Sequence, residues 1–322
     1  MKDLRLLKII GLGMLMLILS ACKGSPDDPP AEGAFKADIQ LDWVPEPEFG
    51  GYYAARDSGL FSQEHLEVHL KPGGPGVPTL QLIESGQVTF GITTADNILI
   101  ARDRGADLVA LFALYQTFPA GIMVHAERGL HGLEDVFKEG TLAMEPGTPT
   151  FKFLEKRFGF HHIHVVPYTN NLSPFLHDPQ LAQQCYVTAE PIAARRAGAS
   201  PFVFPISDAG YNPYSGILVT KREVLIKHKD EVRRLIRAIK AGWTAYLKDP
   251  TSANQAMHQL NPTMDEATFE ASSKIQAPLI VGSPGTPIGQ MTLERWQTLS
   301  GQLVELGLIQ PSDPQSAFEP SE

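Results

Sequence analysis

The residues best suited to bind a small molecule lie in one loop, residues 42–53, which reads DWVPEPEFGGYY. Trp43 offers a flat face for stacking, and Glu46 or Glu48 can accept hydrogen bonds from amino groups. Two prolines restrict the backbone of the loop, and two adjacent glycines let the backbone approach another group closely. The alternative is that Trp43 fills the core and that the two glutamates are solvated.

Two further segments place hydroxyl side chains where a helix is expected to begin. These are residues 93–97 (TTADN) and residues 145–150 (EPGTPT), the second of which includes Thr148. A hydroxyl at such a position either caps the helix or, together with free backbone N–H groups, holds an acceptor of a ligand. We expect capping to be the main role of Thr94, and the same two interpretations apply to Thr148.

A fourth segment, residues 186–191 (YVTAEP), ends in a carboxylate directly before a proline. Glu190 either stabilises the dipole of the following helix or points into a cleft between lobes. The histidines at 161, 162 and 164 have no carboxylate or cysteine at ligand spacing, so we expect no metal site. Motifs of serine hydrolases, zinc proteases and phosphate loops are absent from the sequence, and we expect no catalytic residues.

These segments are positioned by alternating strand and helix patterns, which predict an α/β fold with largely parallel sheets. Strands are expected at 37–43, 66–70, 88–92, 108–114, 121–125, 141–144, 164–168 and 202–205, with another after 180–185 and a returning strand at 217–220. Helices are expected at 49–58, 77–84, 95–104, 133–138, 150–158 and 191–197. Ligands of open α/β sheets bind beyond the carboxyl ends of the strands, so two such units facing each other would enclose a cleft.

The C-terminal third is predicted to be helical and to contribute to the core. Apolar residues recur at three- and four-residue steps in two stripes. The first stripe comprises Val232, Leu235, Ile236, Ile239, Trp243, Tyr246 and Leu247, and the second comprises Leu293, Trp296, Leu299, Leu303 and Leu306. The last dozen residues are expected to form a loose tail.

The N-terminus has the pattern of a lipoprotein signal sequence. A basic start and an apolar run end in Leu19-Ser20-Ala21-Cys22, which resembles the bacterial lipobox. We therefore expect cleavage before Cys22, lipidation of its thiol and a flexible tether over 22–36. The net charge of −9 argues against nucleic acid as a partner. The remaining cysteine, Cys185, is expected to be a buried apolar side chain.

From about Phe35 to Leu308 the sequence resembles a family of substrate-binding lipoproteins of ABC importers. The family includes formylaminopyrimidine-binding proteins and the fungal thiamine-pyrimidine synthases. The resemblance rests on residues 41–55, 59–61, 83–91, 186–191 and 229–232. It implies the two-lobed periplasmic-binding-protein fold (type II), with a mostly parallel sheet flanked by helices in each lobe. We expect one lobe at 37–117 plus 213–310, the other at 118–212, and a tail at 311–322.

The resemblance also implies roles for individual residues. Trp43 would stack on the ligand ring and Glu190 would hydrogen-bond it, with Tyr186 and Glu46 as neighbours. Pyrimidine binders often carry Asn and His where this loop has Glu46 and Phe49. Phe49, and separately Tyr115, would either line the site or fill the core.

The synthase relatives have a lysine and a histidine at the positions of Thr93 and Asn97. With neither residue present, we expect no pyridoxal phosphate cofactor and no enzyme, and we keep Thr93 and Asn97 as candidate ligand contacts. Sulfonate and nitrate binders of the wider class should favour cationic or N–H-rich sites, whereas this loop is acidic.

The sequence therefore predicts a monomeric, lipid-anchored binding protein in the bacterial cell envelope. It would capture an aromatic heterocycle, such as a thiamine-precursor aminopyrimidine or a similar vitamin-like compound, and deliver it to a permease and its ATPase. The alternatives are a pyrimidine synthase that uses pyridoxal phosphate and histidine, and a sulfonate- or nitrate-type importer component.

Overall fold

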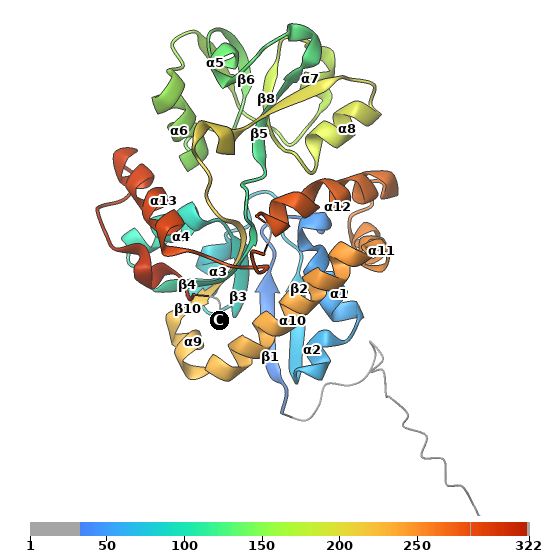
Figure 1. Ribbon diagram of the computed structural model, residues 1–322, viewed down its shortest axis with the longest axis vertical. Coiled ribbons are helices and arrows are strands. Elements are labelled where there is room, and N and C mark those ends of the chain that lie inside the picture. The colour runs from blue at the N-terminus through green and yellow to red at the C-terminus, as the bar shows by residue number, and fades with distance from the viewer. Residues whose placement is uncertain (1–32, 284, 321–322) are drawn as a thin grey trace, which may run out of the picture.

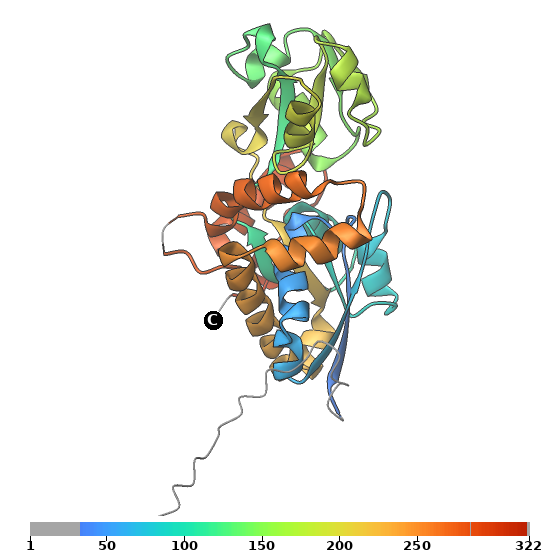
Figure 2. The same cartoon turned by 90° about the vertical axis from the view of Figure 1, so that its right-hand side faces the viewer.

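The computed structural model describes residues 33–283 and 285–320, which form two lobes stacked one above the other (Figure 1). A view turned by 90° shows the same two lobes joined at their facing sides (Figure 2). The expected signal sequence and Cys22 lie outside the described residues. Among the helices that are described, none is long and apolar enough to cross a membrane.

The lower lobe of Figure 1 is built on a five-stranded sheet with the order β2-β1-β3-β10-β4. β1 pairs in parallel with β2 and β3, and β10 lies antiparallel to β3 and β4. Every residue of β4 is buried, as expected for a strand covered on both faces. The strands are β1 (Phe35–Gln40), β2 (Leu66–Lys71), β3 (Phe90–Thr93), β4 (Leu108–Tyr115) and β10 (Ser215–Lys221).

The upper lobe has a second five-stranded sheet with the order β7-β6-β8-β5-β9. β6 pairs in parallel with β7 and β8, and β5 lies antiparallel to β8 and β9. The strands are β5 (Ala120–His125), β6 (Gly140–Ala143), β7 (Ile163–Val166), β8 (Ala182–Tyr186) and β9 (Pro201–Pro205). We expected a strand after residues 180–185, but this segment itself forms most of β8.

The predicted α/β architecture with mostly parallel sheets is confirmed. Four strands of each described sheet run in one direction, and one strand runs against them, β10 in the lower sheet and β5 in the upper. Both reversed strands are those that the chain enters directly after crossing from one lobe to the other, over residues 116–119 and 206–214.

Helices cover the faces of both sheets. Those of the lower lobe are η1 (Pro47–Phe49), α1 (Gly50–Asp57), α2 (Leu60–Gln63), α3 (Thr79–Glu84), α4 (Ala95–Asp103), α9 (Arg222–Lys227), α10 (Lys229–Lys248), α11 (Thr251–Leu260), α12 (Glu266–Val281), α13 (Leu293–Glu305) and η4 (Pro314–Ala317). Those of the upper lobe and the return crossing are η2 (Ala126–Arg128), α5 (Leu133–Val136), α6 (Pro149–Phe158), α7 (Ser173–His177), α8 (Glu190–Arg196) and η3 (Ile206–Ala209).

The packing of α1 against α10 holds the loop that precedes α1. Trp243 and Tyr246, from the predicted apolar stripe of α10, are almost completely buried. A Cβ atom on Gly51 would lie 2.3 Å from the Trp243 ring, and one on Gly50 would lie 2.2 Å from the Tyr246 ring. Only glycine allows the two helices to approach this closely, so the paired glycines of the loop serve helix packing.

Arg295 of α13 joins the two crossings between the lobes. Its guanidinium donates to the backbone oxygen of Gln116 at 2.5 Å in the first crossing, and to that of Asn212 at 2.8 Å in the second. The same group lies 3.9 Å from the centre of the Tyr214 ring. Because one side chain is bonded to both crossing segments, their spacing is fixed where the lobes meet.

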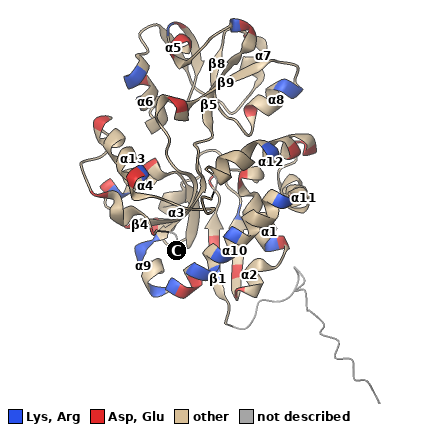
Figure 3. Ribbon diagram, viewed as in Figure 1, with Lys and Arg blue, Asp and Glu red and all other residues tan. Residues whose placement is uncertain are grey.

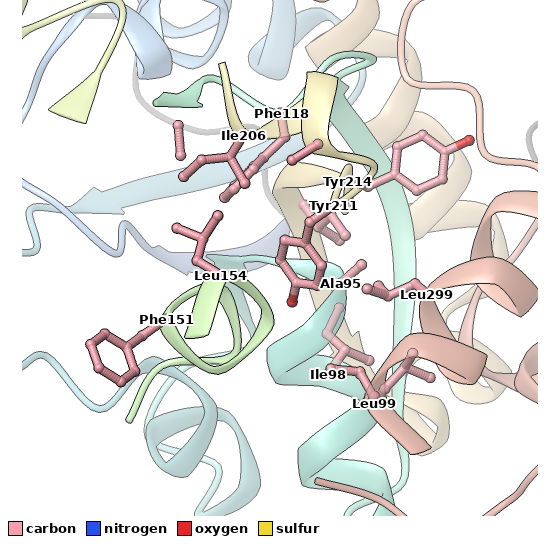
Figure 4. Close-up of a cluster of buried hydrophobic side chains, with 14 of the residues drawn as sticks. Ala95, Ile98, Leu99, Phe118, Phe151, Leu154, Ile206, Tyr211, Tyr214 and Leu299 are labelled. Atoms are coloured by element: carbon pink, nitrogen blue, oxygen red, sulfur yellow. The ribbon is translucent and has the colours of Figure 1, made fainter. Parts of the chain in front are cut away.

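Beside the crossings the lobes share one hydrophobic cluster (Figure 4). Leu154 of α6, from the upper lobe, belongs to the same cluster as Ile98 and Leu99 of α4 from the lower lobe, with Tyr211 of the second crossing between them. Apolar contact therefore closes the side of the molecule where α6 meets α4.

The structure corrects two expectations at the ends of the folded part. The tether was expected to reach Lys36, but β1 begins at Phe35, which pairs with Leu66 of β2. The expected loose tail over 311–322 is wrong for residues 314–319. Phe318 is buried and stacks on Trp296 at 5.5 Å, because the tail has an apolar side chain for which the core provides a partner.

Candidate functional site

A cleft of about 700 Å³ lies between the two lobes. The lower lobe contributes the loop after β1, the start of α4 and residues 263–268 before and within α12. The upper lobe contributes residues 144–150, the segment after β7, and the end of β8 with the start of α8. All of these segments except residues 263–268, which lie between α11 and α12, follow the carboxyl ends of strands, as expected for an open α/β architecture.

Most of the residues singled out from the sequence are brought together around this cleft. Those that line it are Trp43, Glu46, Phe49, Asn97, Thr148, Tyr186 and Glu190. Thr93 and Tyr115 are not among the lining residues: both are buried, in β3 and β4 respectively. Thr94, one residue further along, faces the cleft in place of Thr93.

The acidic loop is held against α11 and α12 through its backbone. Asn261 donates from Nδ2 to the backbone oxygen of Pro45 at 3.2 Å, and Gln276 donates from Nε2 to that of Pro47 at 2.8 Å. The hydroxyl of Tyr115 donates to Oε1 of Gln276 at 2.8 Å. Tyr115 thus supports the loop from below, and the prolines supply carbonyl oxygens without requiring a partner for an N–H.

Three carboxyl groups of this loop are partly buried beside one another. Burial raises the pKa of Asp42 from its ordinary 3.8 to about 6, although a hydrogen bond from the backbone lowers it in part. Burial is the main cause that raises the pKa of Glu46 from 4.5 to about 7, and the charge of Glu190 adds to it. A hydrogen bond from the Trp43 side chain lowers the pKa and offsets part of this shift. Burial and the charges of neighbouring carboxylates also hold the pKa of Glu48 well above its ordinary value. The loop therefore contains acids that retain protons near neutral pH.

Glu190 begins α8 and has a defined hydrogen-bond environment. The hydroxyl of Tyr168 donates to its Oε1 at 2.5 Å, and the backbone N–H of Tyr186 donates to its Oε2 at 2.8 Å. Burial raises its pKa, although these hydrogen bonds oppose the shift. Each carboxylate oxygen can accept a second hydrogen bond, so Glu190 keeps capacity for a ligand donor.

The start of α4 is organised by Asp96, a residue that the sequence reasoning missed. Asp96 accepts from the hydroxyl of Tyr211 at 2.6 Å and from the backbone N–H of Asn97 at 2.9 Å. The hydroxyl of Thr94 also donates to Asp96, and its side chain does not cap the helix. The capping prediction for Thr94 is therefore wrong, because the nearby carboxylate is the better acceptor.

Thr148 does cap its helix, since its hydroxyl accepts from the backbone N–H of Phe151 at 3.2 Å. The same residue lines the cleft, so the two interpretations of Thr148 are compatible. Among the described residues, no group of three or more histidine, cysteine or acidic side chains is arranged to hold a metal ion.

The charges that line the cleft are strongly unbalanced (Figure 3 shows all charged residues). Within the described part of the chain the lining contains seven carboxylate residues and one arginine, Arg196. Arg196 is itself paired with Asp265, whose Oδ2 lies 3.1 Å from its Nη2. An anion entering the cleft would find no unpaired cation among these lining residues, whereas an amino group or a cation would meet several acceptors.

Sequence reasoning also missed Tyr168, Arg196 and Asp265. Asp265 and Thr268 have the spacing of a helix start, and Asp265 does accept from the N–H of Thr268 at 2.9 Å. That local signal could have located the helix, but nothing local places it at the cleft. Tyr168 follows β7, a position from which the open α/β architecture could have indicated it.

Comparison with known proteins gives relatives of one kind. The chain is 22% identical over 330 residues to a formylaminopyrimidine-binding protein of Halalkalibacterium halodurans, covering 97% of each chain. It is 23% identical over 289 residues to the riboflavin-binding protein RibY of Chloroflexus aurantiacus, covering 80% of this chain and 79% of that one. Both named relatives are binding proteins, which agrees with the expectation that the chain is no enzyme.

Among solved structures, the periplasmic aliphatic sulphonate binding protein SsuA from Escherichia coli superposes with a TM-score of 0.70. It is 14% identical and is matched over 92% of this chain and 94% of that chain. This similarity confirms the periplasmic-binding-protein fold that we expected. Residues 46–253, well over half of the chain, match the family described as NMT1/THI5 like. The chain therefore belongs to the NMT1/THI5-like family.

Proposed function

We propose that this chain is the substrate-binding protein of an ABC importer and that its ligand is a flat heterocycle bearing amino groups or a positive charge. The observation that carries the proposal is the cleft, which is lined by seven carboxylate residues, a tryptophan and a single, already paired arginine. Acceptors and a flat aromatic face suit a ring with N–H donors. The names of the formylaminopyrimidine- and riboflavin-binding relatives support the same class.

The proposed recognition assigns separate tasks to the two lobes. Trp43 in the lower lobe stacks on the ring, and Glu46 accepts hydrogen bonds from one edge of it. Glu190 and Tyr186 in the upper lobe bind the opposite edge when the lobes close. Thr93 and Tyr115 do not contact the ligand in this proposal; they lie in β3 and β4 and support the residues that line the cleft.

The alternative function, binding of a sulfonate, is supported by the similarity of the fold to that of SsuA, but the residues that line the cleft give it little support. A sulfonate needs unpaired cations or a set of N–H donors, and the lining carries a large excess of carboxylates. The synthase alternative lacks the lysine that would hold pyridoxal phosphate. We retain both as outcomes of the ligand test.

The setting of the protein is also part of the proposal. The lobes 37–117 with 213–310 and 118–212 move as two units on a monomer. Lipidated Cys22 anchors the protein to a bacterial membrane at the cell envelope. The closed, loaded form delivers its ligand to a permease and its ATPase.

The test is thermal unfolding of the purified protein with aminopyrimidines, thiamine, riboflavin, taurine, nitrate and pyridoxal phosphate. A ligand present at about 100 times its Kd stabilises the fold by about 2.7 kcal/mol. We expect a shift with an amino heterocycle. A shift with taurine or nitrate alone would overturn the assignment.

Site variants then test the assigned contact. Glu190→Gln should weaken the identified ligand about 10- to 100-fold, since a hydrogen bond to a charged group contributes about 1.5–3 kcal/mol. Glu139→Gln, at an exposed glutamate outside the lining of the cleft, is the matched control for charge and should bind as the wild type. Equal affinities of the wild type and Glu190→Gln by calorimetry would remove Glu190 from the site.

A further inference from the structure

An ion pair bridges the cleft on the side away from the apolar contact of α6 with α4. Arg196, the last residue of α8 in the upper lobe, donates from Nε to Oδ2 of Asp265 at 3.1 Å. Its Nη2 lies 3.1 Å from the same oxygen. Asp265 precedes α12 of the lower lobe, and both residues line the cleft. In Figure 3 the blue end of α8 and the red start of α12 lie on the same side of the molecule.

Both partners of the pair are tied to segments that face the ligand site. α8 runs from Glu190 to Arg196, so the carboxylate in the cleft and the arginine of the bridge lie at the two ends of one seven-residue helix. On the other side, α12 follows Asp265 and carries Gln276, which holds the acidic loop through the oxygen of Pro47. The bridge therefore connects an element of the upper lobe to an element of the lower lobe across the cleft.

We propose that the Arg196–Asp265 pair is a latch that keeps the lobes together before any ligand binds. Arg196 is a positioning residue: it acts on the ligand site through Asp265 and the placement of α8. The lobes would then alternate between a latched and an open form, and ligand binding would favour the latched form already present. This inference concerns the ligand-free protein, so it stands or falls independently of the ligand's identity.

The size of the effect follows from the exposure of the pair. The side chains of Arg196 and Asp265 are 46% and 57% exposed, so the pair is partly screened by solvent and salt. Exposed ion pairs change an equilibrium constant by a modest factor, about 1.5- to 5-fold. An ion pair of this strength favours the form in which the lobes are together and still lets them separate.

The test measures the distance between the lobes in the ligand-free, full-length protein. Spin labels are placed at two exposed positions, Glu139→Cys in the upper lobe and Lys229→Cys in the lower, in a Cys22→Ser background. Cys185 is buried and is not expected to react with the label. Pulsed electron paramagnetic resonance then gives the populations of the short and long distances.

Two conservative variants break the latch without changing the elements that carry it. Arg196→Gln removes the cation, and Asp265→Asn removes the charge while keeping a side-chain oxygen to cap α12. Each should lower the ratio of short to long distances about 1.5- to 5-fold, and the double variant should show no further loss. Arg195→Gln, at the adjacent exposed arginine of α8, is the matched control and should resemble the wild type.

Salt provides a second measurement that a purely structural role would not reproduce. At about 1 M salt the wild type should shift toward the long distance, and Arg196→Gln should not respond. The proposal is overturned if the low-salt wild type is already open. It is equally overturned if both single variants match the wild type, or if their effects add in the double variant. Circular dichroism of each variant confirms that the compared proteins are folded.

Discussion

Replacing Glu46 by glutamine should remove much of the pH dependence of stability of this protein. Its pKa is raised from 4.5 to about 7 in the folded state, so the native protein binds more protons than the unfolded chain between these values. Where the native state binds more protons, stability falls as pH rises. The penalty is absent below pH 4.5, grows through the window and is complete above pH 7.

The magnitude follows from the difference between the two values. Raising a pKa from 4.5 to about 7 corresponds to about 3 kcal/mol of stability lost once the group is ionised. Most of this loss, about 2–3 kcal/mol, falls between pH 5 and pH 8. Asp42, with a pKa of about 6, adds a similar loss of stability at lower pH, so the Glu46→Gln variant should retain that part of the pH dependence.

Urea unfolding at pH 5, 6, 7 and 8 measures this effect. We expect Glu46→Gln to match the wild type within about 1 kcal/mol at pH 5 and to exceed it by about 3 kcal/mol at pH 8. Glu145→Gln removes one negative charge from an exposed part of the same lining and is the control for net charge. If Glu46→Gln and the wild type lose stability with the same slope, Glu46 is not the buried acid that the structure describes.

Two further predictions concern the parts that hold the acidic loop. Tyr115→Phe should lower the free energy of unfolding by about 1–2 kcal/mol, and Gln276→Leu by about 2–4 kcal/mol, because Gln276→Leu leaves the Tyr115 hydroxyl and the Pro47 oxygen unpaired. Urea unfolding of both variants and their double mutant checks this, and fully additive effects would contradict the shared contact. Gly51→Ala should cost about 1–3 kcal/mol, since the new methyl group would lie 2.3 Å from the Trp243 ring. A melting temperature within a degree of the wild type would show that α1 and α10 are not fixed by this contact.

Elements with a strong local signal could be predicted from the sequence. The run at 108–114 is apolar without interruption, which is typical of a strand buried on both faces, and β4 occupies that segment. The stripe through Trp243 has the three- and four-residue spacing of a helix that buries one side, and α10 does so. In both cases the local pattern of apolar residues in the sequence is enough to indicate the type of element.

The candidate site could be predicted in part, and its gaps have a physical cause. The loop with Trp43 and Glu46 was indicated by its composition, whereas Asp265 and Arg196 reach the cleft only through the packing of two lobes. Thr93 is the last residue of β3 and Thr94 follows it directly, yet only Thr94 lines the cleft. Successive side chains of a strand point to opposite faces, so a boundary error of one residue exchanges them.

The fold by itself does not determine the charge of a ligand. SsuA shares the architecture, yet nothing in a sheet order of β2-β1-β3-β10-β4 selects between an anion and a cation. That choice lies in side chains beyond the strand ends, and here Asp42, Glu46 and Glu48 crowd together at a cost in stability. Folding alone would favour a neutral side chain at each of these positions. Their presence in one loop is consistent with the function that we propose, since an N–H group or cation of a ligand would offset the cost of placing these acids together.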